Sequence, residues 1–316
     1  MNSPNQDAAS GSITHTEEVP AALADERLDR VVSMLTDLSR SAAARLIVEG
    51  QVRLDGEVAF VRSIRLSEGQ RLEITVENEA TQPKLIADSS VVTTVVYSDE
   101  HVIVVDKPAG LVVHPGAGNT SGTLIHGLLA QFPELAEIGA PERPGLVHRI
   151  DKGTSGLMVV ARSAVAYEDL SEQFSRHSTT RDYQALVWGE LENSEGLIDA
   201  PLGRSGRDAT RMTVAVGGRE ARTRYQVLKR FSDPLVTLLQ CHLDTGRTHQ
   251  IRVHLSAIKH PIVGDGVYGR LRPAIALPRP FLHAARLVFT HPGSGDEMAF
   301  TSALPVELEA VLQTLS

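Results

Sequence analysis

The chain has 316 residues, of which 42% are hydrophobic and 22% charged, and its formal net charge at pH 7 is −8. This is an ordinary water-soluble composition, long enough for two domains, and no apolar run approaches the roughly 20 residues of a membrane span. The single cysteine, Cys241, excludes an intramolecular disulfide and fits a reducing, cytoplasmic location.

The first 24 residues are polar and have neither the basic nor the apolar region of a signal peptide. We therefore expect a disordered tail over residues 1–24. The charge of the chain is also unevenly distributed: residues 1–20 contribute −3, whereas residues 204–230 carry eight Arg or Lys against two acids. Because the local field governs phosphate binding, the negative net charge does not exclude a nucleic-acid partner.

Residues 25–76 are predicted to form a small separate module. Apolar residues at helical spacing in "ERLDRVVSML" indicate one helix, and "SRSAAARLIVEG" indicates a second that ends before Gly50. The stretch "QVRLDGEVAF" is an alternating strand, an Asp55-Gly56 turn and a return strand, and "GQRLEITVE" supplies a further strand. The module is therefore two short helices followed by a small sheet.

This module resembles the S-four RNA-binding domain in "RLDR", "SRS" and "LIVEGQVRLDGEV". The resemblance implies binding to structured RNA through the helical face. The alternative is a small αβ module whose arginines are only solvated. The residues expected to bind RNA are Arg27, Arg30, Arg40, Arg45 and Arg53.

Residues 77–92 are polar and are predicted to be a linker to a second domain over residues 93–316. The second domain begins with two apolar runs around residues 98–100, which indicate a hairpin. Strand patterns then outnumber helix patterns, and hairpin-like connections recur. We expect an α+β fold with a mixed, mainly antiparallel sheet, flanking helices and a central cleft.

Several standard sites are missing from this second domain. The sequence has no phosphate-binding loop of the NTPase type and no dinucleotide-binding spacing, and "GTSGL" is not a nucleophile elbow. The four histidines between residues 242 and 260 lack the H-E-x-x-H pattern, so we expect no metal site.

Three separated motifs remain as candidates for chemistry. They are "HRIDKGTSG" around Asp151, "RDYQALVWG" around Tyr183, and "LDTGRTHQIRVHLSAIKHPIVGDGVYG", which contains Arg252. A catalytic carboxylate needs a cation that keeps it ionised and oriented, and arginine does so with a planar fork; an aromatic ring offers a face for a base. The simpler interpretation of Asp151 is a turn residue, because Asp and Gly favour turns.

Together these motifs resemble the RluA-type pseudouridine synthases. With "HPGAGNTSGT" and the S-four module, they are most similar to the RluD-like branch, which acts on large-subunit ribosomal RNA. The resemblance implies isomerisation of uridine to pseudouridine without a cofactor or metal, by a cytoplasmic monomer acting on 23S ribosomal RNA, in the helix 69 stem-loop.

The resemblance also implies roles for individual residues. Asp151 is the expected catalytic carboxylate, Tyr183 packs on the uracil, and Arg252 pairs with Asp151 through its fork. Arg149 fills the space left by the flipped nucleotide. Two alternatives stay open: a catalytically silent RNA-binding protein, and a hydrolase that pairs Asp151 with a histidine such as His148. The other residues expected to contact substrate are His148, Lys107, Arg247, His249, Gln250 and Ile251.

Overall fold

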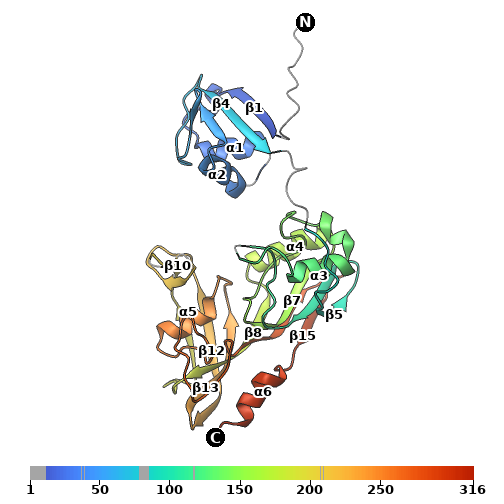
Figure 1. Ribbon diagram of the computed structural model, residues 1–316, viewed down its shortest axis with the longest axis vertical. Helices are drawn as coiled ribbons and strands as arrows, with labels where there is room; N and C mark the ends of the chain where they lie inside the picture. Colours follow the sequence, from blue (N-terminus) through green and yellow to red (C-terminus); the bar gives the residue numbers. More distant parts are fainter. Residues whose placement is uncertain are drawn as a thin grey trace. The chain divides into compact units, whose positions relative to one another are not determined.

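The computed structural model describes residues 12–316 except residues 37, 39, 78–84, 117, 207 and 209. The chain divides into two compact units between Pro83 and Lys84, inside the polar segment predicted to be a linker. Each unit has its own buried apolar core and is described by itself (Figure 1). No helix among the described residues is both long and apolar enough to cross a membrane.

The first unit packs two helices against a four-stranded sheet of strand order β1-β4-β2-β3. The predicted helical spacing is confirmed, because Leu28, Val31 and Val32 are fully buried on one face. Asp55 and Gly56 both have positive φ, 51° and 84°, as a type I′ hairpin turn requires. The elements are η1 (Ala21–Leu23), α1 (Leu28–Thr36), α2 (Arg40–Val48), β2 (Val52–Leu54), β3 (Glu57–Val58) and β4 (Arg71–Glu77).

The prediction of a disordered tail over residues 1–24 is wrong for its second half. Strand β1 (Ser12–Glu18) pairs antiparallel with β4 along its whole length, from Ser12 opposite Glu77 to Glu18 opposite Arg71. The side chains described in this strand are polar and exposed, so its pairing rests on backbone hydrogen bonds. Composition does not reveal such a strand. Residues 1–11 lie outside the described part.

The second unit is built on a nine-stranded sheet of order β5-β6-β7-β14-β8-β13-β12-β9, with β15 paired to β14. Only β7 and β14 pair in parallel; every other neighbouring pair is antiparallel. The strands are β5 (Thr94–Ser98), β6 (Val102–Lys107), β7 (Ser155–Ala161), β8 (Thr180–Trp188), β9 (Glu195–Asp199), β12 (Arg222–Ser232), β13 (Leu235–Leu243), β14 (Leu282–Thr290) and β15 (Glu297–Thr301), with β10 (Leu202–Arg204) and β11 (Met212–Val214) in a separate pair.

Helices cover the sheet on both faces. Every residue of β7 is buried: Met158 and Val160 lie in a core shared with α3, and Leu157 and Val159 lie in a core shared with α4. Figure 1 shows α3 and α4 beside the β5–β7 half of the sheet and α5 beside β12 and β13. The predicted α+β class is confirmed. The helices are α3 (Leu124–Gln131), η3 (Pro133–Glu137), α4 (Ala164–Ser175), α5 (Gln250–Ala257) and α6 (Val306–Gln313).

The last residue of "GTSG" must be glycine because of the backbone geometry at the start of β7. Gly156 has φ 114° and lies opposite Ala284 in the parallel pairing of β7 with β14. A Cβ atom at this position would come within 2.3 Å of the backbone oxygen of Ala284. Only glycine allows the two backbones this approach, and it fixes β7 directly after the loop that carries Asp151.

Candidate active site

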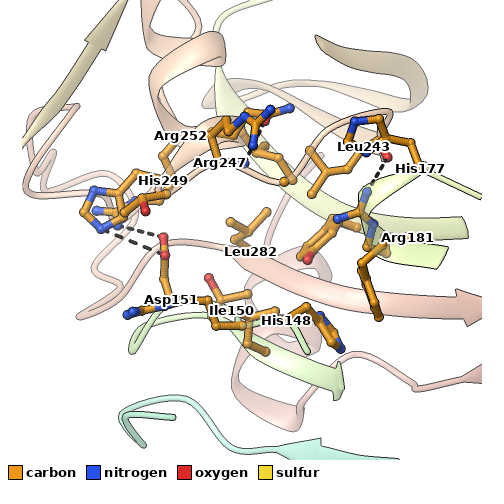
Figure 2. Close-up of a pocket in the computed structure, with 18 of the residues that line it drawn as sticks. His148, Ile150, Asp151, His177, Arg181, Leu243, Arg247, His249, Arg252 and Leu282 are labelled. Atoms are coloured by element: carbon orange, nitrogen blue, oxygen red, sulfur yellow. Dashed lines mark hydrogen bonds and ion pairs between the residues drawn. The ribbon is translucent and has the colours of Figure 1, made fainter. Parts of the chain in front are cut away.

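Nine of the ten residues that the sequence suggests for catalysis or substrate binding line one cavity of about 390 Å³ in the second unit. They come from three separate stretches: the loop before β7, strand β8, and the turn before α5 together with the first residues of that helix. Figure 2 shows Asp151, His249 and Arg252 along one side of this cavity. The nine residues are His148, Arg149, Asp151, Tyr183, Arg247, His249, Gln250, Ile251 and Arg252.

Asp151 lies in a turn, as the simpler interpretation expects, since the backbone N–H of Thr154 donates to its backbone oxygen at 3.0 Å. Its carboxylate, however, is not used by the turn. Nη1 of Arg252 donates to Oδ2 at 3.1 Å, and Nε2 of His249 lies 3.9 Å from Oδ1 (Figure 2). With 18% of its side chain exposed, the carboxylate is available to a molecule in the cavity.

Arg252 pairs with Asp151, as predicted, but its planar fork serves another residue. Nε and Nη2 donate to Oδ2 and Oδ1 of Asp265 at 2.8 and 3.0 Å, and only Nη1 reaches Asp151. The expectation that Arg252 binds Asp151 through the planar fork of its guanidinium is therefore wrong. The reason is the direction from which Arg252 enters the site: the backbone loop after α5 presents Asp265 to the edge of the guanidinium.

Asp265 is 1% exposed and holds its charge through hydrogen bonds. Burial alone would raise its pKa, but donation from Arg252 and from the backbone N–H groups of Val267 and Tyr268 lowers the pKa below its usual range. Burial likewise opposes the charge of Arg252, yet contacts with the two carboxylates raise the pKa of the guanidinium. The three charges form a chain that ends at the cavity.

His249 lies beside this chain in a left-handed backbone conformation, with φ 58°, directly before α5. Its Nδ1 is 2.7 Å from the hydroxyl of Tyr268, which also accepts the backbone N–H of Met212 at 2.9 Å. The contact with Tyr268 holds the ring so that Nε2 faces Asp151. Burial, more than any neighbour, lowers the pKa of His249.

Tyr183 projects from β8 into the cavity and is 7% exposed. Burial raises the pKa of its hydroxyl to about 12, so the phenol keeps its proton at neutral pH. After burial, the charge of Arg181 lowers the pKa of this hydroxyl and that of Asp151 raises it. A neutral aromatic ring in this position suits stacking on a base.

Gln250 and Ile251 line the cavity but are occupied by structural contacts. Oε1 of Gln250 accepts the hydroxyl of Thr245 at 2.8 Å and the backbone N–H of Arg247 at 3.0 Å, and its Nε2 donates to the backbone oxygen of Arg222 and to Thr223. Ile251 is 4% exposed and belongs to the main core. Both residues therefore shape the turn before α5.

His148 is held in a neutral, structural role. Its Nε2 accepts the backbone N–H of Val159 at 3.0 Å, and its ring stacks on Phe174 with the ring centroids 4.3 Å apart. Burial, assisted by Arg181, lowers the pKa of His148 to about 3. Because its acceptor nitrogen is already used, His148 is a poor general base for a hydrolase.

Lys107 is the predicted substrate contact that does not line the cavity. It is fully buried at the end of β6, and its Nζ donates to the backbone oxygens of Pro108 and Leu111 at 2.8 and 2.9 Å, with that of Lys152 at 3.4 Å. Burial lowers its pKa to about 7. Through these hydrogen bonds Lys107 stabilises the backbone of the Asp151 loop.

Arg149 is exposed at the cavity and has one hydrogen-bond partner among the described residues. Its Nη1 donates to Nε2 of His114 at 2.9 Å, while Nδ1 of His114 donates to the backbone oxygen of Pro115 at 2.7 Å. Burial lowers the pKa of His114, and this favours the neutral ring that can accept from Arg149.

The five arginines predicted to bind RNA lie in the first unit and differ in their surroundings. Arg27 donates twice to Asp29, at 2.9 and 3.0 Å, and Arg30 pairs with Glu26. Arg45 is exposed on α2, and Arg53 donates to the backbone oxygen of Gly56. Arg40 begins α2, but its side chain lies outside the described part.

Sequence reasoning missed Asp265, Tyr268 and His114. Asp265 and Tyr268 stand in "VGDGVYG", where an acid between two glycines after a helix is a usable signal of a turn that presents a carboxylate. His114 follows an apolar strand-like run and gives no such signal. Among the described residues, no group of three or more His, Cys, Asp or Glu is arranged to hold a metal ion.

The sequence of this chain is similar to those of known proteins. Residues 101–257 match the family described as RNA pseudouridylate synthase, and residues 26–72 match the S4 domain. The Ribosomal large subunit pseudouridine synthase D of Nitrosomonas europaea is 43% identical over 312 residues, covering 94% of this chain and 86% of that protein. The protein of the same name from Pseudomonas aeruginosa is 41% identical over 319 residues, covering 97% of both.

A solved structure agrees with these matches. The human RNA Pseudouridylate Synthase Domain Containing 1 superimposes with a TM-score of 0.57 at 26% identity, covering 71% of this chain and 89% of that one. The matched residues include the Asp151 loop, β8 and α5, which together form the cavity. This chain therefore belongs to the RluA family of RNA pseudouridine synthases, in its RluD-like branch with an S4 domain, and is an isomerase that converts uridine in RNA to pseudouridine.

Proposed function

We propose that this enzyme modifies specific uridines of 23S ribosomal RNA, in the stem-loop of helix 69, with Asp151 as its catalytic carboxylate. The names of the two bacterial relatives support a large-subunit substrate. A stem-loop is physically sensible because extruding a base costs a few kcal/mol, and the cost is least where bases are already unstacked.

The reaction needs no donor or acceptor of electrons. The bond between N1 of uracil and C1′ of ribose breaks, the uracil turns while held in the cavity, and C5 bonds to C1′. The proton on C5 leaves and N1 gains one, so atoms balance without a cofactor. The protein must hold a charged carboxylate beside the ribose and a flat surface beside the base.

The observation that carries this proposal is the pairing of Asp151 with Arg252 at 3.1 Å inside the cavity that Tyr183 also lines. The guanidinium donates a charge-assisted hydrogen bond to the carboxylate and so orients it. The neutral ring of Tyr183 stacks on the uracil, and Arg149 fills the space that the extruded nucleotide leaves in the RNA. Ile251 supplies apolar packing at the floor.

Release of tritium from RNA labelled at C5 of uridine tests the reaction and the role of Asp151. Asp151→Asn keeps the volume of the side chain and removes its charge, so tritium release should fall more than roughly 100-fold while RNA affinity changes little. If the variant retained a few per cent of the wild-type rate, Asp151 would not be the catalytic carboxylate.

The same assay separates the two alternatives. An RNA-binding protein without activity would release no tritium in the wild-type form. A hydrolase would liberate free uracil and leave the C5 label in it. Sequencing-based mapping of pseudouridine in a strain that lacks this enzyme tests the site, because loss at helix 69 is expected and loss elsewhere alone would overturn that assignment.

A further inference from the structure

A buried arginine at the far end of the cavity has no acidic partner. Arg181 is 7% exposed on β8 and lines the cavity on the side opposite Asp151 (Figure 2). Its Nη2 makes one long hydrogen bond, 3.3 Å, to the backbone oxygen of Leu243, and its Nε is buried without any partner. Across the described ranges of the chain, no carboxylate oxygen lies within ion-pair distance of this guanidinium.

An unpaired buried guanidinium is unusual because arginine stays protonated in proteins and buried charges are normally paired. Burial lowers the pKa of Arg181, so the surroundings disfavour its charge. The charge of Asp244 acts on Arg181 and raises its pKa in part, but both oxygens of Asp244 accept from Arg224 at 3.1 Å. The anion that would balance Arg181 is therefore not supplied by the described residues.

Packing restricts the side chain of Arg181, so it cannot turn toward a different partner. Its Cζ lies 5.4 Å from the ring centroid of Phe174, and a Cβ atom on Gly246 would come within 2.6 Å of its Nη1. The guanidinium is thus held between an aromatic face and a glycine backbone. Such fixed donors bind a ligand without losing side-chain freedom.

Other cations line the same cavity. Arg219 and Arg247 line the cavity, and the charge of Arg219 helps to lower the pKa of Arg247 after burial. His177 also lines it, and burial, then Arg181, Arg247 and Arg222, lowers its pKa. The residues that line the cavity include five arginines and one carboxylate, that of Asp151, so the lining is positive overall.

We propose that Arg181, with Arg247 and Arg219, binds a phosphodiester group of the RNA directly beside the target uridine. This inference rests on the proposed function of the cavity. Asp151 and Arg181 lie on opposite sides of it and Tyr183 also lines it, a set of groups that fits the ribose, phosphate and base of one extruded nucleotide (Figure 2). The free edge of the guanidinium offers N–H donors to phosphate oxygens in the fork geometry that arginine uses for this group.

The test combines one protein change with one RNA change. Arg181→Met keeps contact with Phe174 and removes the charge. In the RNA, a neutral methylphosphonate replaces either of the two phosphates that flank the target uridine. For the wild-type enzyme, one of the two replacements should lower kcat/KM about 10- to 100-fold, as expected for a charge-assisted hydrogen bond. On RNA with unmodified phosphates, Arg181→Met should lower kcat/KM by a similar factor. The slope of log(kcat/KM) against the logarithm of the salt concentration should become shallower by about one.

The effects of the protein change and the RNA change on kcat/KM should not be additive. In Arg181→Met, the sensitive methylphosphonate should cost less than about twofold, because the partner is already gone. Equal sensitivity of both proteins to both replacements would overturn the subsite. Arg176→Met is the matched control: Arg176 is exposed and pairs with Glu172 on α4, so this variant should respond to the methylphosphonates as the wild type does.

Thermal unfolding gives a measurement that does not depend on the identity of the substrate. Inorganic phosphate, compared with sodium chloride at equal ionic strength, should raise the Tm of the wild type more than that of Arg181→Met. An equal rise in both proteins would overturn the subsite. Absence of any conversion of helix 69 RNA by the wild type would instead overturn the proposed substrate, while the phosphate comparison still decides the subsite.

Discussion

Arg252 divides its guanidinium between two carboxylates of different kinds. The edge formed by Nε and Nη2 is occupied by buried Asp265, and Nη1 alone reaches Asp151. The bond to Asp265 fixes the plane of the guanidinium, and the bond to Asp151 then has a set direction. Asp265 acts on the reaction through Arg252 and is a positioning residue.

Asp265→Asn should destabilise the fold by about 3 kcal/mol, because it leaves a buried guanidinium with one carboxylate fewer. Urea unfolding at neutral pH measures this loss. Asp296→Asn, at an exposed position, is the control and should stay within about 0.5 kcal/mol of the wild type. Equal stability of Asp265→Asn and the control would show that the buried pairing contributes nothing.

The same pair of proteins tests the pH dependence. The pKa of Asp265 is lowered in the folded state, so its stabilisation is present above the unfolded value, about 3.9, and is lost as the pH falls through the folded value. The stability difference between wild type and Asp265→Asn should therefore shrink below about pH 4. A difference that stays constant from pH 7 to pH 3 would contradict the lowered pKa.

At this scale, the sequence predicts which residues meet but not how they bond. The motif around Asp151 and the motif around Arg252 are specific enough to place both in one site. The orientation of the guanidinium depends on Asp265, which reaches it through a turn that no local periodicity describes. His148 and Lys107 were assigned to substrate by motif membership, and only burial and hydrogen bonding reveal their structural roles.

At the scale of elements, β6 supports the Asp151 loop through Lys107. Its Nζ donates to the backbone oxygens of Pro108 and Leu111, and the oxygen of Lys152 also accepts the N–H of Gly110 at 2.7 Å. The end of β6 and the residue after Asp151 are thereby tied together. Burial of this lysine makes the tie sensitive to pH.

The unfolding free energy of the wild type should rise between about pH 7 and about pH 10.5. The folded pKa of Lys107 is about 7 and the unfolded value 10.5, so in this window the unfolded chain binds more protons. The slope from this group approaches about 1.4 kcal/mol per pH unit. Lys107→Met should lack this contribution when urea unfolding is measured at pH 7 and pH 9; equal slopes would refute the assignment.

The parallel contact of β7 with β14 is the second element-scale feature that can be tested. Gly156→Ala would place a Cβ 2.3 Å from the oxygen of Ala284, at a φ of 114° that L side chains rarely adopt. We expect a loss of about 2–4 kcal/mol in stability and a larger loss of activity than of RNA affinity, because the Asp151 loop shifts with β7. Gly206→Ala, with open space around it, is the control. Wild-type stability and activity in Gly156→Ala would refute this.

Periodicity and turn signals are sufficient to predict most helices and strands, but they do not predict which strands pair with one another. The β5–β6 hairpin is confirmed, because it depends on a local pattern. Strand β1 was missed because its polar side chains follow no apolar alternation. The insertion of β14 between β7 and β8 pairs it with residues 97 to 128 positions earlier in the chain, which no local signal specifies.

At the scale of the whole molecule, substrate docking and chemistry are assigned to separate units. The first 83 residues carry eight arginines and fourteen acids, so removing them makes the protein less negative. Bulk charge therefore predicts equal or tighter RNA binding by the truncated enzyme. Specific contacts from the S4 unit predict the opposite.

We expect residues 84–316 to fold, because they contain a complete core, and to bind RNA more weakly with a shallower salt dependence. Apparent KM should rise, and the single-turnover rate at saturating RNA should change much less. Arg45→Ala in the full chain is a milder probe of the same contacts, since Arg45 is exposed. If the truncated enzyme has the same RNA affinity and the same salt dependence as the full chain, the S4 unit does not bind this RNA.

The place of β14 in the sheet has a consequence for synthesis of the enzyme. This strand joins the β5–β7 half to the β8–β9 half, yet it begins only at Leu282, after every other strand except β15. Because chains emerge from the ribosome N-terminus first, the S4 unit is complete once Glu77 has emerged, more than two hundred residues before the catalytic sheet can close. A growing chain therefore carries its RNA-binding unit in folded form well before it has an active site.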